Sequence, residues 1–208
     1  MSRQNGPWTV HGVQTGYENP WIRVDHHEVT CPDGAPGIYG VVRFANLAIG
    51  VLPLFEDGTT MLVGQHRFTF DDYSWELPEG GGPRGEAPED TAHRELAEET
   101  GITAGQLVPL GEAQLSNSVT DEYSHYFLAW DLKLGEASPD PDEVLEQRRV
   151  PFSTLVDDII SGRVLDSLTI LMVQGAILKA QLGLLPKAPA DTIIDELSRV
   201  EGFRRPGE

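Results

Sequence analysis

This sequence of 208 residues has a single cysteine, Cys31, so no disulfide can form within the chain. A secreted scaffold held by disulfides is therefore excluded, and a reducing compartment fits. Long apolar runs are also missing, because no stretch approaches the roughly 18 apolar residues of a membrane span. The first residues, MSRQNGPWTV, contain no apolar signal core. We therefore expect a cytoplasmic protein with no membrane partner.

Basic residues are scarce: 15 lysines and arginines stand against 33 aspartates and glutamates, a net charge of -18. Binding to long nucleic acid needs clustered Lys and Arg, so we do not expect it. The same charge would repel a small phosphorylated substrate unless cations lay between protein and phosphate, which favours a metal site. The hydrophobic share of 39% is ordinary for a globular protein and excludes a disordered one.

The spacing of apolar and turn-forming residues predicts a chain that mixes strands and helices. Residues 1–45 read as short strands and turns, and Glu56-Asp57-Gly58 as the turn of a hairpin. We expect strands at 47–54, 61–64 and 126–130, and helices at 88–100, 152–160 and 167–182, the last capped by Asp166. Between them we expect a glycine-rich loop at 79–86 and a polar loop at 134–143. A weak helix is expected after Pro186, followed by a frayed end.

The predicted helix at 88–100 carries charges that oppose its own stability. Glu95, Glu98 and Glu99 lie at spacings that share one helix face, and like charges there cost about 0.2–0.5 kcal/mol per pair. They also lie near the C-terminal end, where the helix dipole disfavours negative charge. A solvated acidic face would explain them, but so would a bound cation, since carboxylate oxygens suit Mg²⁺ or Mn²⁺.

The wider spacing around these glutamates forms a longer pattern. It reads Gly-x5-Glu-x7-Arg-Glu-U-x-Glu-Glu-x-Gly-U, where U is a bulky apolar residue. The matching residues are Gly80, Glu86, Arg94, Glu95, Leu96, Glu98, Glu99, Gly101 and Ile102. At ordinary residue frequencies a chance match in a chain of this length is below about one in a million. The pattern is the Nudix box, and the chain resembles the Nudix hydrolase family.

The resemblance implies roles for the residues of the box. Glu95, Glu99 and Glu98 are the expected ligands of Mg²⁺ or Mn²⁺, with about two to three ions per site, and the backbone carbonyl of Glu79 commonly joins them. Glu86 would act through Arg94, which could hold the loop to the helix, or through a metal-bound water.

Three flanking segments narrow the resemblance to the branch that hydrolyses ADP-ribose and nucleoside diphosphate sugars. They are Trp75-Glu76-Leu77-Pro78, Gln65-His66-Arg67 and Thr120-Asp121-Glu122. In that branch the arginine contacts the substrate and a loop carboxylate assists catalysis, which implies these roles for Arg67 and Glu122.

Several of these assignments have open alternatives. Glu76 and Trp75 are further candidates for substrate binding, although Glu76 could pair locally and Trp75 could belong to the core. Asp121 is the rival of Glu122 as the base, with Glu98 next. The branch often carries Ser-Pro-Gly where this chain has Ser116-Asn117-Ser118, so a GDP-sugar or another nucleoside diphosphate sugar stays as open as ADP-ribose.

The fold that the resemblance implies is the Nudix α/β/α sandwich, with a mixed sheet between helices and the box as a loop and helix. Residues 1–45 resemble a small β-rich N-terminal extension that helps form a homodimer, and 46–208 the Nudix domain with its C-terminal helices. The expected reaction gives a nucleoside monophosphate and a sugar phosphate. The alternatives are a silent nucleotide-binding sensor, a nucleoside triphosphatase or an isopentenyl diphosphate isomerase.

Overall fold

The structure, a computed structural model, describes residues 2–139 and 144–201. Its strands are β1 (Arg3–Asn5), β2 (Trp8–Glu18), β3 (Ile22–Thr30), β4 (Pro36–Phe44), β5 (Asn46–Pro53), β6 (Thr59–Arg67), β7 (Asp72–Glu76), β8 (Glu79–Pro83), β9 (Ile102–Gln114), β10 (Tyr123–Leu134) and β11 (Glu146–Pro151). Its helices are α1 (Pro88–Thr100), α2 (Phe152–Ile160), α3 (Ser167–Gln181) and α4 (Lys187–Leu197).

The predicted helices are confirmed, and their ends follow the local signals. Pro88 lies in the first turn of α1, and Gly101 ends that helix in the left-handed conformation at φ 71°. The Asp166 carboxylate accepts a hydrogen bond of 2.6 Å from the backbone N–H of Thr169 and so caps α3. The predicted frayed end and part of the predicted loop at 134–143 lie outside the described residues. Among the described helices, none combines the length and apolar character that crossing a bilayer requires.

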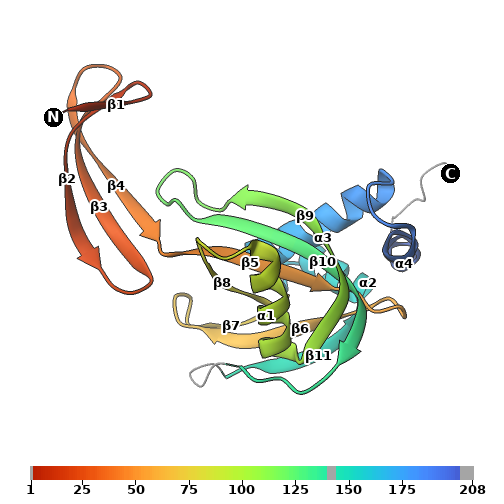
Figure 1. Cartoon of the computed structure of the whole chain (residues 1–208). Coiled ribbons are helices and arrows are strands. Elements are labelled where there is room, and N and C mark those ends of the chain that lie inside the picture. The colour runs from red at the N-terminus through yellow and green to blue at the C-terminus, as the bar shows by residue number, and fades with distance from the viewer. Residues whose placement is uncertain (1, 140–143, 202–208) are drawn as a thin grey trace.

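A mixed sheet forms the centre of the main domain, with strand order β8-β5-β10-β9. β10 runs parallel to β5, and the other pairs are antiparallel. Helix α1 covers one face of this sheet and α3 the other (Figure 1). The predicted α/β/α sandwich is therefore confirmed.

The alternation of side chains along β5 explains how one strand serves both faces. Ile49 and Val51 are fully buried against the α1 side, while Leu52 is fully buried against the α3 side. Gly50 also faces α3, and a Cβ atom there would lie 2.8 Å from Met172. A side chain at this position would therefore push α3 away from the sheet.

The predicted hairpin at 56–58 is only partly correct. The turn exists, with Gly58 at φ 81° and the Phe55 carbonyl accepting 3.0 Å from the Gly58 N–H. Beyond one isolated bridge between Leu54 and Thr60, however, β6 leaves β5 and pairs with β11 and β7 in a second sheet. The reason is that both edges of β5 are already paired, to β8 and to β10.

Strands β1 to β4 form a separate antiparallel sheet, here called the extension (residues 3–44). Figure 1 shows it standing away from the central sheet, with β4 leading directly into β5. Backbone hydrogen bonds tie it to the loop before β10: the Val42 N–H donates to Val119, and the Asp121 N–H donates to the Val42 carbonyl. The extension is thus fastened to the segment that precedes Glu122.

The end of α1 provides a test of how tightly the fold is packed there. A Cβ atom on Gly101 would lie 2.6 Å from the Gly135 carbonyl oxygen, whereas Gly183, also at positive φ, has open space around it. We expect Gly183→Ala to lower the free energy of unfolding by about 1–2 kcal/mol, the cost of a left-handed alanine. Gly101→Ala should cost clearly more, because the clash adds to that strain. Urea unfolding of both variants measures the difference. Equal losses in the free energy of unfolding would show that the backbone near residue 135 moves and relieves the clash.

Candidate metal and substrate site

The glycine-rich segment before α1 is a strand rather than the predicted loop. Residues 79–83 form β8 and pair with β5, with Gly80 opposite Ile49. The glycines permit a close approach to the helix: a Cβ atom on Gly80 would lie 2.2 Å from the Glu95 carboxylate, and one on Gly82 would lie 2.8 Å from Thr91. The strand therefore lies directly against the acidic face of α1.

Arg94 organises the carboxylates of that face. Its guanidinium donates to Glu95 at 2.8 Å and to Glu98 at 2.9 Å, while Glu86 lies farther away at 3.8 Å. The expected link between Arg94 and Glu86 is therefore present as a long ion pair. Glu86 also accepts a hydrogen bond of 3.0 Å from the Thr91 hydroxyl. Burial alone would lower the pKa of Arg94, but the charges and hydrogen bonds of Glu95 and Glu98 raise it overall.

Glu99 connects the helix to β8. Its carboxylate is only 2% exposed and accepts 3.1 Å from the backbone N–H of Glu79. Glu95 is 9% exposed. Two carboxylates withdrawn from water at the seam between α1 and β8 are costly unless positive groups are near them.

Arg67 lies at the end of β6 and is held by two glutamates. Its Nε donates to Glu76 at 2.8 Å, a second bond joins Nη2 to the same carboxylate, and Nη2 also lies 3.1 Å from Glu79. Burial alone would lower the pKa of Arg67, but these two carboxylates raise it. Glu76 is 2% exposed, and this bidentate ion pair with Arg67 is the local pairing that was the alternative to a role of Glu76 in substrate binding.

The Glu79 side chain is a feature that sequence reasoning missed, since only its backbone carbonyl was expected to matter. Burial, with the nearby charges of Asp166 and Glu76, raises the pKa of this carboxyl well above its usual range, against the opposing effect of Arg67. Its Oε2 atom is buried and has no hydrogen-bond partner within the described residues. The charge of Asp166, a residue expected only as a helix cap, therefore also acts on Glu79, and no local sequence pattern could have shown this.

These residues fit a divalent cation. The donors are carboxylate oxygens, which hard cations prefer, and the unpartnered Glu79 oxygen faces a region of excess negative charge. As the side chains lie, no group of three or more His, Cys, Asp or Glu in the described parts of the chain is arranged to hold a metal. In this arrangement Arg94 holds one oxygen of Glu95 and one oxygen of Glu98.

Trp75 lies on β7, and its faces are already in contact with protein. The Arg148 guanidinium lies 4.4 Å from the ring centroid, and Tyr73 packs edge-on at 5.6 Å. A cation over an aromatic face is stabilising, so stacking a nucleobase on that face would displace Arg148. The substrate-binding role of Trp75 stays a prediction.

Asp121 and Glu122, adjacent in sequence, have different surroundings. The Asp121 carboxylate accepts 2.8 Å from the Phe44 N–H and lies 3.4 Å from Arg43, so it anchors the loop to the extension. Glu122 is half-buried, and its burial raises the pKa of its carboxyl. A carboxylate with a raised pKa is the better proton acceptor near neutral pH.

Comparisons with known proteins agree with this geometry. The NUDIX domain profile matches residues 45–167, and the profile named "Nucleoside diphosphate sugar hydrolase N-terminal domain" matches residues 8–42. An ADP-ribose pyrophosphatase of Bacillus subtilis is 33% identical over 157 residues, covering 74% of this chain and 84% of the relative. A GDP-mannose pyrophosphatase of Yersinia enterocolitica is 32% identical over 130 residues, covering 58% of this chain and 67% of the relative.

A solved structure described as an ADP compounds hydrolase has the same fold. It superposes with a TM-score of 0.76 at 20% identity, covering 88% of this chain and all of that chain (100%). The profile match spans more than half of the 208 residues and includes the strand, helix and carboxylates of the site. The chain therefore belongs to the Nudix hydrolase family.

Proposed function

We propose that this enzyme hydrolyses the diphosphate of a nucleoside diphosphate sugar and releases a nucleoside monophosphate and a sugar phosphate. The observation that carries the proposal is the acidic seam between β8 and α1. There Glu95 lies against Gly80, Glu99 accepts a hydrogen bond from the Glu79 N–H, and the Glu79 carboxyl has an unpartnered oxygen. The named relatives that act on ADP-ribose and GDP-mannose support the class of substrate.

Glu95, Glu98, Glu99 and the backbone carbonyl of Glu79 would hold the divalent cations, which we propose to be Mg²⁺ or Mn²⁺, about two to three per site. Bound there, they would neutralise the diphosphate and make the attacking water more acidic. Glu86 would support them through Arg94 or a water.

The chain's own groups supply the remaining chemistry. Arg67 is fixed by Glu76 and Glu79, so its guanidinium needs little reorganisation to meet a phosphate oxygen. Glu122 would accept the proton of the water, since its pKa is raised by burial. Release of Arg94 from Glu95 and Glu98 would free its guanidinium to stabilise the negative charge that develops on the diphosphate during hydrolysis.

Product analysis tests the reaction. The enzyme is incubated with nucleoside diphosphate sugars, dinucleotides and nucleoside triphosphates, with Mg²⁺ or with EDTA, and the products are identified by mass. We expect a nucleoside monophosphate and a sugar phosphate, loss of activity in EDTA and its return with Mg²⁺ or Mn²⁺. Pyrophosphate released from a triphosphate would show another Nudix class, an isomerised diphosphate with no phosphate released would show an isomerase, and binding without any product would show a sensor.

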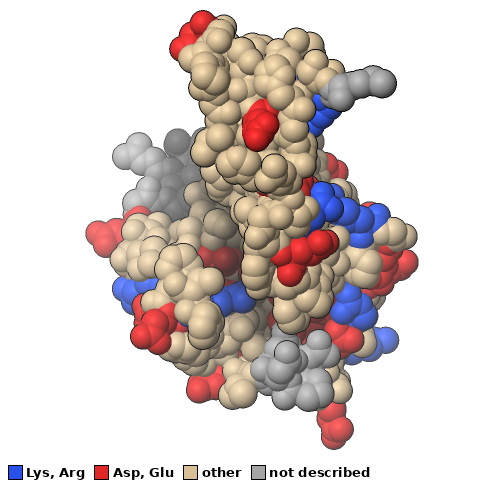
Figure 2. Space-filling model, turned by 90° about the vertical axis from the view of Figure 1, so that its left-hand side faces the viewer, with Lys and Arg blue, Asp and Glu red and all other residues tan. Residues whose placement is uncertain are grey.

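We also propose that residues 1–45 are an extension through which two chains form a homodimer, and that the protein is cytoplasmic, as its single cysteine suggests. Large apolar side chains are exposed on the extension, among them Trp21 at 68% and Ile38 at 70%. Most of the extension's surface in Figure 2, where it forms the upper lobe, is uncharged. Exposed apolar surface of this kind marks protein interfaces.

A double substitution tests this interface. We expect Trp21→Glu with Ile38→Glu to convert the dimer to a monomer by light scattering, because charges buried at an interface are strongly unfavourable. Leu184→Glu, at a site 65% exposed in the turn after α3, is the control and should leave the dimer intact. A dimer that survives the double substitution would place the interface elsewhere.

A further inference from the structure

A cavity of about 270 Å³ lies between the extension and the loop of residues 116–120. One wall comes from β1 to β4 and the other from Asn117 to Thr120, and the Tyr39 hydroxyl closes one side by donating 2.6 Å to the Ser118 carbonyl. None of the described residues that line it is an aspartate or a glutamate. Its lining carries two arginines, in a chain with a net charge of -18, and two aspartates outside the lining, Asp25 and Asp121, pair with one of them, Arg43.

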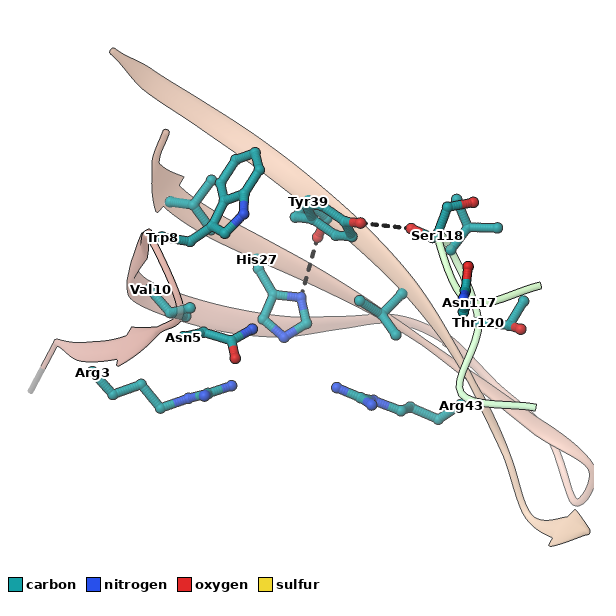
Figure 3. Close-up of a pocket in the computed structure, with 13 residues that line it drawn as sticks. Arg3, Asn5, Trp8, Val10, His27, Tyr39, Arg43, Asn117, Ser118 and Thr120 are labelled. Carbon is teal, nitrogen blue, oxygen red and sulfur yellow. Dashed lines mark hydrogen bonds between the residues drawn. The ribbon is translucent and has the colours of Figure 1, made fainter. Parts of the chain in front are cut away.

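The cationic groups of the cavity converge. Figure 3 shows Arg3 and Arg43 reaching toward each other from opposite sides, with the His27 ring above the gap between them. The bonds that hold Arg43 to Asp25 and Asp121 use Nε and Nη1. These aspartates offset part of the Arg43 charge, and the two planar guanidinium forks that face one gap would suit phosphate oxygens placed between them.

The His27 ring is oriented by its other contact. Its Nδ1 lies 3.1 Å from the Tyr39 carbonyl, which can only accept, so Nδ1 carries the hydrogen. The second ring nitrogen is turned toward the gap between the arginines (Figure 3). Asn5 adds an amide on the same side, so several polar groups from β1, β3 and β4 point to one position.

The rest of the cavity is larger and less polar than a bare anion needs. At about 30 Å³ per water, its volume corresponds to roughly nine waters. Val10, Val29 and Val41 contribute apolar surface, and Trp8 packs edge-on against Tyr39 at 5.5 Å. Aromatic and aliphatic walls beside a few convergent polar groups are typical of a small-molecule site.

The cavity is separate from the acidic seam. It belongs to the extension, which stands away from α1 and β8 (Figure 1). It does touch the loop that precedes Glu122, through Ser118 and Thr120.

We propose that this cavity binds a small phosphate monoester, with the phosphate between Arg3 and Arg43 and the organic group against Trp8. The site is distinct from the acidic seam, because no residue of the seam lines it.

Calorimetric titration in EDTA, which removes cations from the acidic seam, tests the proposal with AMP, inorganic phosphate and adenosine as probes. We expect AMP to bind once per chain and adenosine at least about tenfold more weakly, since it lacks the charged group. If inorganic phosphate bound as tightly as AMP, the ligand of the cavity would be free phosphate rather than a phosphate monoester. Arg3→Gln should weaken AMP binding at least about tenfold, while Arg163→Gln, an exposed arginine far from the cavity, should not change it.

Two further measurements locate the bound probe. AMP should shift the indole N–H signal of Trp8, assigned through Trp8→Phe, and Glu99→Gln should leave the AMP affinity unchanged. The proposal is overturned if AMP does not bind in EDTA, if adenosine binds equally well, if Arg3→Gln has no effect, or if Glu99→Gln abolishes binding. The last result would place the probe in the acidic seam instead.

Discussion

Replacing Glu99 with glutamine is expected to lower kcat at least about 100-fold while the fold stays intact, since charge stabilisation by metals is usually worth several kcal/mol. The substitution keeps the shape of the side chain and one oxygen acceptor for the Glu79 N–H, but it removes a negative charge from the seam. Steady-state kinetics at saturating Mg²⁺ measures the loss, and thermal unfolding checks the fold.

Glu89→Gln is the matched control for this experiment. Glu89 lies in the first turn of the same helix, is exposed, and is remote from β8. Its substitution should leave kcat within about twofold, as surface substitutions usually do. A Glu99→Gln enzyme as active as this control would contradict the assignment of Glu99 to the metal site.

The second large effect is expected at Glu122. If this carboxylate accepts the proton, Glu122→Gln should lower kcat by about 10²–10⁴-fold, the usual size of general-base catalysis, with little change in KM. The raised pKa of Glu122 gives the sign of the pH dependence: activity falls as the pH drops through that pKa, because the protonated carboxyl cannot act as a base. In the variant this acidic limb should flatten, and a pH–rate profile measures it.

Asp121→Asn separates catalysis from loop anchoring. Asp121 accepts from the Phe44 N–H and pairs with Arg43, so its substitution should loosen the loop and lower thermal stability while retaining the acidic limb. If Asp121→Asn flattens the limb and Glu122→Gln does not, the base is Asp121. If neither does, Glu98 becomes the first candidate.

Features that depend on residues close together in the chain could be predicted from the amino-acid sequence. Helix α1 could be predicted because Pro88, Gly101 and the spacing of its glutamates act within a few turns. Strand β5 of the central sheet could be predicted from the apolar run at 47–54. The grouping of the seam's carboxylates could be predicted because their spacing places them on one helix face. These signals are local, so they do not depend on knowing which strand pairs with which.

Contacts between segments that are distant in the chain depend on the assembled fold and could not be predicted from local signals. β8 is a strand because β5 offers it an edge, and β6 leaves β5 because that strand has no edge left. The charge of Asp166 raises the pKa of Glu79, and Arg3 and Arg43 line one cavity, across separations in the chain that follow no spacing rule. The physical reason is that hydrogen-bond pairing and burial depend on the register of whole sheets, and they set the partner and the pKa of each charged group only after the sheets have assembled.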